Sequence, residues 1–79
     1  MDVLLFGPAA RAAGASSVSV LVPEPCAASE VLERLPQQHP AITFALPGSR
    51  LAVNHAFAAA DTVIRPGDEL ALIAMVSGG

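Results

Sequence analysis

The chain has no tryptophan, tyrosine or lysine, and only one cysteine among its 79 residues. Because Cys26 has no partner, an intramolecular disulfide is excluded. All four basic residues are arginines, scattered along the chain without interleaved aromatic residues, and this pattern argues against nucleic-acid binding. The absence of lysine also means that the chain has no side-chain amine to capture an activated acyl group, so it cannot form polymers linked through lysine.

The sequence also lacks the motifs of metal, phosphate and catalytic sites. His39 and His55 are the only histidines, and no HxxxH or CxxC spacing occurs, so we expect both histidines on the surface and no metal site. The pair Asp68-Glu69 follows a Pro-Gly turn, where we expect both carboxylates to be solvated, and Ser77 has no evident base beside it. A phosphate-binding loop of the form GxxxxGK is absent. The sequence therefore predicts a protein that is not an enzyme.

The sequence has no long hydrophobic segment. No apolar run approaches the roughly 20 residues that cross a bilayer, and a predicted strand follows Met1-Asp2 without the basic region of a signal peptide. We therefore expect a cytoplasmic protein that does not contact membranes. The length predicts one domain over residues 1–79. The hydrophobic fraction of 53% is high for this size, so some apolar surface is expected to remain available to a partner.

Hydrophobic patterning predicts five strands and one main helix. The strands are expected at residues 3–6, 18–22, 51–54, 57–58 and 69–76, and the helix at residues 27–35. Continuous apolar runs are typical of central strands, so we expect the first and last strands to be parallel neighbours, with the helix packed across one face of the sheet. This order of elements predicts an α+β protein with a mixed sheet and a β-grasp, or ubiquitin-like, fold.

Small residues, proline and glycine mark the expected connections. Residues 9–16 are predicted to be a flexible connection that joins the first two strands as a hairpin. Pro36 cannot donate a backbone hydrogen bond and is predicted to kink or end the main helix near residue 35. One further helical turn is expected over residues 41–46. Tight turns are expected at Pro47-Gly48 and at Pro66-Gly67.

Gly78-Gly79, the last two residues of the sequence, have no side chains and follow an apolar, strand-like run. Because glycine restricts the backbone little and allows another backbone to approach closely, we expect residues 76–79 to be a flexible tail that can enter a narrow channel of a partner. The distinctive reactive group is then the carboxylate of Gly79. ATP can activate a carboxylate as an acyl adenylate, and a sulfur donor can displace AMP to leave a terminal thiocarboxylate.

Several short segments in this order resemble one known family. They are Val3-Leu4-Leu5-Phe6, Gly14, Ala52-Val53-Asn54, Pro66-Gly67-Asp68-Glu69 and Val76-Ser77-Gly78-Gly79. With these segments the whole chain resembles the ubiquitin-like sulfur carriers of the MoaD/ThiS family, and within it most closely the small subunits of molybdopterin synthase.

The resemblance implies a β-grasp domain that binds no cofactor of its own. An adenylating enzyme related to ubiquitin activators would use ATP to adenylate Gly79, and a sulfur-transfer protein would supply the sulfur. The large catalytic subunit of molybdopterin synthase would then bind the carrier, typically as a heterotetramer, and pass sulfur to a cyclic pterin precursor. Gly78 would keep the tail thin, and Phe6 is either a partner-surface residue or a core residue. The residues expected in the partner's channel are Met75, Val76, Ser77 and Gly78.

Three positions depart from the family pattern. Ala74-Met75 stands where the family often has two prolines, Arg11 replaces a common acidic residue, and Pro36 interrupts the helix. Three other interpretations therefore stay open. The chain could carry sulfur to another pathway, such as thiamine thiazole or cysteine formation. It could be a ubiquitin-like modifier that forms isopeptide bonds with lysines, or an interaction module with an inert tail.

Overall fold

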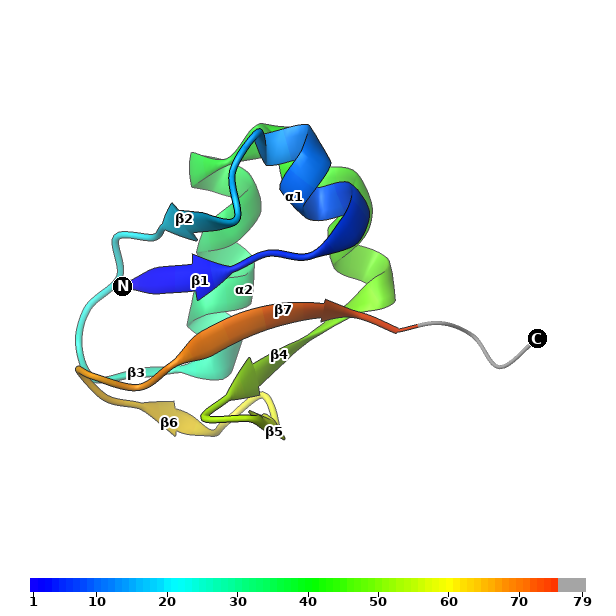
Figure 1. Cartoon of the computed structure of the whole chain (residues 1–79). Helices are drawn as coiled ribbons and strands as arrows, with labels where there is room; N and C mark the ends of the chain where they lie inside the picture. The colour runs from blue at the N-terminus through cyan, green and yellow to red at the C-terminus, as the bar shows by residue number, and fades with distance from the viewer. Residues whose placement is uncertain (76–79) are drawn as a thin grey trace.

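A five-stranded mixed sheet forms the centre of the protein in the computed structural model, which describes residues 1–75 (Figure 1). The strand order is β2-β1-β7-β4-β5. The bounds are β1 (Asp2–Leu4), β2 (Ser17–Ser19), β4 (Ser49–Val53), β5 (Ala56–Phe57) and β7 (Leu70–Ala74). The other elements are α1 (Gly7–Ala13), α2 (Ala28–Gln38), the 3-10 helix η1 (Pro40–Gly48), and the strands β3 (Cys26–Ala27) and β6 (Val63–Ile64).

The first and last strands of the chain are parallel neighbours, as predicted. Val3 of β1 is in register with Leu70 of β7, and β7 pairs on its other side with β4 in antiparallel orientation. The helix α2 crosses one face of this sheet (Figure 1). The predicted α+β fold of the β-grasp type is therefore confirmed.

Alternation along the strands separates a packed face from an open face. On β7, Leu70 and Leu72 are buried, whereas Ala71 and Ile73 point to the opposite side and are partly exposed. The packed face meets α1, α2 and η1 in one aliphatic core, and the open face carries no helix (Figure 1). The largest buried side chains are Val3, Val20, Val31, Leu35, Ile42, Leu51, Ile64, Leu70 and Leu72.

Residues 9–16 are not the predicted flexible connection, because helix α1 occupies most of this segment. Pro8 lies in the first turn, where its missing N–H costs no helical hydrogen bond, and alanines follow it. Gly14 ends the helix in the left-handed conformation, with φ of 69°. Buried Ala9 attaches α1 to the core. The strand predicted at residues 18–22 is also shorter, because β2 ends at Ser19.

Of the two outcomes predicted at Pro36, a kink or an end of the main helix, the structure excludes the end. Helix α2 continues through Pro36 to Gln38, and the N–H of His39 still donates to the carbonyl of Leu35 at 2.8 Å. Val31 and Leu35 are fully buried, so tertiary packing outweighs the loss of one helical hydrogen bond. The helical turn predicted over residues 41–46 is confirmed and extends further in η1.

Two further differences from the prediction concern the end of η1 and the start of α2. Pro47-Gly48, expected as a separate tight turn, belongs to the end of η1. The short pair β3–β6 was not predicted; it joins Cys26 to Ile64 and holds the start of α2 against the core. None of the helices in the described part of the chain has the length and apolar character needed to span a lipid bilayer.

Candidate functional site

The end of β7 is where the predicted tail leaves the domain. Met75, the last residue described, is 45% exposed, and its N–H donates to the carbonyl of Gly48 at 2.7 Å. This bond fastens the end of β7 to the end of η1. The other predicted tail residues, Val76, Ser77, Gly78 and Gly79, lie outside the described residues.

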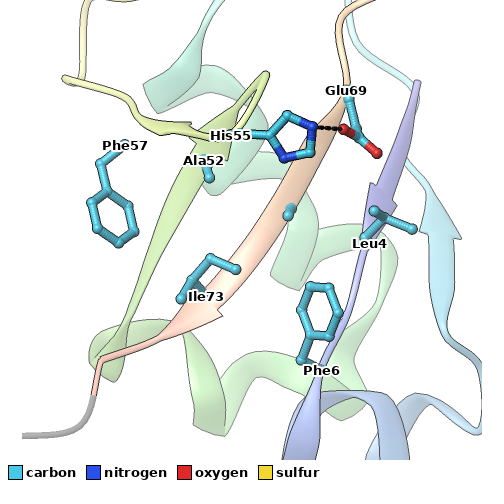
Figure 2. Close-up of a pocket in the computed structure, with 8 residues that line it drawn as sticks. Leu4, Phe6, Ala52, His55, Phe57, Glu69 and Ile73 are labelled. Carbon is cyan, nitrogen blue, oxygen red and sulfur yellow. Dashed lines mark ion pairs between the residues drawn. The ribbon is translucent and has the colours of Figure 1, made fainter.

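An apolar groove of about 370 Å³ lies on the open face of the sheet (Figure 2). Small side chains, Ala52 and Ala71, form the middle of this groove, and larger ones surround them. Within the strands, the residues that line the groove alternate with residues of the core, so their side chains lie on the face opposite α2. The groove is lined by Leu4, Phe6, Ala52, His55, Phe57, Glu69, Ala71 and Ile73.

All three aromatic residues of the chain are exposed. Phe6 is 53%, Phe44 61% and Phe57 50% accessible, whereas the core is built from aliphatic side chains. Phe6 is therefore a surface residue, which excludes the expectation that it packs in the core. An aromatic ring left in water on an apolar face is typical of a surface that binds a partner. The sequence singled out only Phe6 as a candidate. Phe57 pairs with Ala52 across β4 and β5, and this pairing becomes visible only in the structure.

A histidine and a carboxylate form the polar end of the groove. Nε2 of His55 lies 2.8 Å from Oε2 of Glu69 (Figure 2). The side chains of His55 and Glu69 are 85% and 49% exposed, so both residues lie on the surface, as predicted. Asn54 and His55 both have positive φ, 50° and 70°, in the turn between β4 and β5. This left-handed turn directs the imidazole toward β7.

Asn54 connects this turn to the turn before β7. Its Nδ2 donates to Oδ1 of Asp68 at 3.0 Å, and its Oδ1 accepts the N–H of Glu69 at 2.9 Å. Asp68 also accepts the N–H of Arg65 at 2.9 Å. The hydrogen bonds from Arg65 and Asn54 lower the pKa of Asp68. Asp68 stays accessible to solvent, in agreement with the prediction, and its hydrogen bonds join the two turns. Gly67 has φ of 92°, as the predicted type II turn requires.

Arg50 lies at the opposite end of the open face, near the end of β7. It is in register with Ile73, and its guanidinium carbon lies 4.8 Å from the centroid of the Phe57 ring. This contact is a cation–π interaction on an exposed surface. The open face thus has a cationic side chain at the end from which the tail leaves and an anionic one at the other.

The remaining polar candidates lie outside the groove. His39 is half-buried rather than exposed, with Nε2 2.6 Å from the carbonyl oxygen of Ser19. Cys26 is buried, and burial is the main cause that raises the pKa of its thiol, so it is not positioned as a nucleophile. Within residues 1–75, no cluster of histidine, cysteine, aspartate or glutamate side chains is suited to a metal ion.

Known proteins resemble this chain in both sequence and fold. A model of the ThiS family matches residues 3–79. The structure of SAMP1 from Haloferax volcanii shares 31% identity over 100% of this chain and 98% of that chain, with a TM-score of 0.81. Another structure, of the Haloferax volcanii small archaeal modifier protein 1, shares 28% identity over 96% of this chain and 97% of that chain, with a TM-score of 0.82.

A more distant likeness is to a complex of subunits 1 and 2 of the molybdopterin-converting factor from Helicobacter pylori 26695. The matching chain is 20% identical, with 99% of this chain and 96% of that chain covered and a TM-score of 0.67. At this identity the likeness supports the fold alone.

Proposed function

The chain belongs to the ThiS family, within the ubiquitin-like sulfur carriers of the MoaD/ThiS type, and from this premise we propose that it is the sulfur-donating small subunit of molybdopterin synthase. In this function Gly79 carries the sulfur as a thiocarboxylate and donates it to the cyclic pterin precursor. The observation that supports the proposal most directly is the apolar open face of the sheet, which ends beside Met75, where the chain continues toward Gly79.

The chemistry takes place on the carboxylate of Gly79 and needs three partner proteins. The carboxylate attacks the α-phosphate of ATP, which is bound by a ubiquitin-activator-like enzyme, and pyrophosphate leaves. Sulfide, delivered by a sulfur-transfer protein, then attacks the acyl carbon, so that a C–S bond replaces the C–O bond to AMP and one proton is released. The product is a thiocarboxylate. The large catalytic subunit of the synthase supplies the groups that act on the pterin.

The domain's own contribution is to dock and to present the tail. A partner that covers the groove excludes water from Phe6, Phe57 and Ile73, and this burial favours binding by roughly 25 cal/mol per Å² of apolar surface. The side chains proposed to lie in the partner's channel are those of Met75, Val76 and Ser77, followed by Gly78. Because glycine has no side chain, the last two residues allow the partner to close around the reacting carbon.

A protein-modifier function is the second candidate, and the similarity to small archaeal modifier protein 1 favours it. The two functions share the activation of Gly79 and differ in the acceptor. In the first, sulfur moves to a small molecule and the carrier is released. In the second, the acyl group of Gly79 moves to an amine of a target protein and stays attached to it.

One experiment separates these functions. The chain is charged with ATP, its activating enzyme and sulfide, then mixed either with the large synthase subunit and the cyclic pterin precursor or with cell extract. We expect molybdopterin to form in the first mixture. Covalent adducts that resist reductant in the second mixture, without molybdopterin in the first, would contradict the proposal and favour the modifier.

Separate variants test the tail and the groove, and a third variant serves as the control. Gly79→Val should stop activation or transfer without changing the folded state. Phe57→Ala should weaken the partner complexes, because it removes an exposed ring at the groove. Leu21→Ala is the control: this side chain is 78% exposed and does not line the groove, so its removal should leave binding unchanged.

A further inference from the structure

The open face of the sheet is complementary in charge to itself. Arg50 lies on this face at the end of β7, beside Ile73, and Glu69 lies on the same face at the other end, just before β7 begins. Ile73 lies four positions after Glu69, which is about 13 Å along a strand. Figure 2 shows Glu69 at the far end of the groove from Ile73.

Neither charge is balanced by a permanent charge within the described residues. Arg50 forms no ion pair in residues 1–75, and its guanidinium rests on the Phe57 ring. Glu69 is half-exposed and pairs there with His55 alone, which is charged only when protonated. A cation and an anion are thus left on an apolar face, where each would gain from an opposite charge on a docked molecule.

We propose that a second copy of this chain docks on the open face in an antiparallel, face-to-face dimer. A two-fold axis lying between the two sheets, perpendicular to β7 near Ala71, reverses the second strand. It therefore places Arg50 of each copy, which lies on β4, about one strand spacing of 4.8 Å to the side of Glu69 of the other copy. The long arginine side chain spans this offset, and the same ion pair forms twice. The exposed rings of Phe6 and Phe57 are covered together with the alanine floor of the groove.

The size of the face sets the strength of this dimer. The strands β1, β2, β4, β5 and β7 have 3, 3, 5, 2 and 5 residues. At about 3.3 Å per residue and about 4.8 Å between strands they cover roughly 300 Å² per copy, well below the roughly 800 Å² per partner of a standard stable interface. The dimer is therefore weak and forms at high protein concentration. A weak dimer shields the apolar face while remaining open to displacement by a tighter partner; this consequence rests on the proposed function, whereas the self-association does not.

A charge-reversal cycle tests the dimer on the full chain. Diffusion coefficients and amide chemical shifts are measured by NMR from millimolar to micromolar concentration for the wild type, Arg50→Glu, Glu69→Arg and the double variant. We expect the wild type to dimerise, with shift changes confined to the open face. Each single variant places like charges over one another and should weaken the dimer at least severalfold, and the double variant should restore it.

Arg50→Glu leaves the contact between His55 and Glu69 intact, so it remains informative even if Glu69→Arg disturbs the turn. A wild type that stays monomeric at millimolar concentration would overturn the proposal. So would a double variant no better than the single ones, or shift changes over α2 instead of the open face. Sulfur charging is measured separately at micromolar concentration: a chain that is charged but monomeric refutes only the dimer, and a chain that dimerises but is never charged refutes only the proposed function.

Discussion

Asn54 joins the turn after β4 to the turn before β7 through two side-chain hydrogen bonds, and replacing it should destabilise the domain out of proportion to its exposed position. Asn54→Ala removes both side-chain hydrogen bonds, to Asp68 and from the N–H of Glu69. It also places alanine at φ of 50°, a left-handed conformation that asparagine adopts more readily. The groove depends on this junction, because Glu69 and His55 form its polar end.

The expected loss follows from these two changes. Two exposed hydrogen bonds contribute about 1–2 kcal/mol together, and a left-handed alanine costs about 1 kcal/mol. The free energy of unfolding should therefore fall by roughly 2–3 kcal/mol. For a domain of this size, this loss corresponds to a decrease in Tm on the order of 10–20 °C. Urea denaturation followed by circular dichroism measures the free energy directly.

Asn54→Gly is the matched control, because it loses the same hydrogen bonds and keeps the left-handed conformation without a Cβ. Glycine also makes the unfolded chain more flexible, at a cost of about 0.4–1 kcal/mol, which offsets most of the strain of about 1 kcal/mol that it relieves. Asn54→Gly should therefore be less destabilising than Asn54→Ala by at most about 0.6 kcal/mol. An alanine variant as stable as the wild type would refute the role of the junction. A glycine variant less stable than the alanine variant would refute the conformational part of the argument.

Three further changes have defined outcomes. Leu72→Ala empties part of the core and should cost about 2–5 kcal/mol in urea denaturation, whereas Ile73→Ala, its neighbour on the open face, should cost less and reduce partner binding instead. Pro36→Ala should stabilise the chain by about 1–2 kcal/mol, since α2 regains a hydrogen bond; a destabilised variant would contradict this. Asp68 has a lowered pKa in the folded protein, so its contribution to stability is present above the unfolded value and is lost as pH falls through the folded value. Unfolding of the wild type should therefore depend more on pH below 3.8, the ordinary value, than unfolding of Asp68→Asn.

The sheet could be predicted from the sequence because its signals are local and strong. Continuous apolar runs identified the central strands, and proline or glycine separated them. Helix α1 was missed although Pro8 and Gly14 frame it, because the small residues between them were interpreted as a flexible loop, when alanine is the strongest helix former. The β3–β6 pair was missed because two-residue strands are too short to show a periodicity.

The groove and its polar end depend on pairs that are distant in sequence. His55 meets Glu69, and Asn54 meets Asp68, only because β4 and β7 run antiparallel and bring their adjacent turns together. No spacing rule along one strand indicates such a contact. Alternation along β7 was readable in advance, however: with Leu72 in the core, Ile73 must face the other side.

The central claim is that Gly79 is charged with sulfur, and the intact mass of the chain tests it most directly. The chain is incubated with ATP, its activating enzyme and a sulfide source, with Gly79→Val as the control. The account predicts a mass gain equal to the replacement of one oxygen by one sulfur, located at Gly79 by fragmentation and absent from the control. An unchanged mass, with an activating enzyme shown to be active on another carrier, would contradict it.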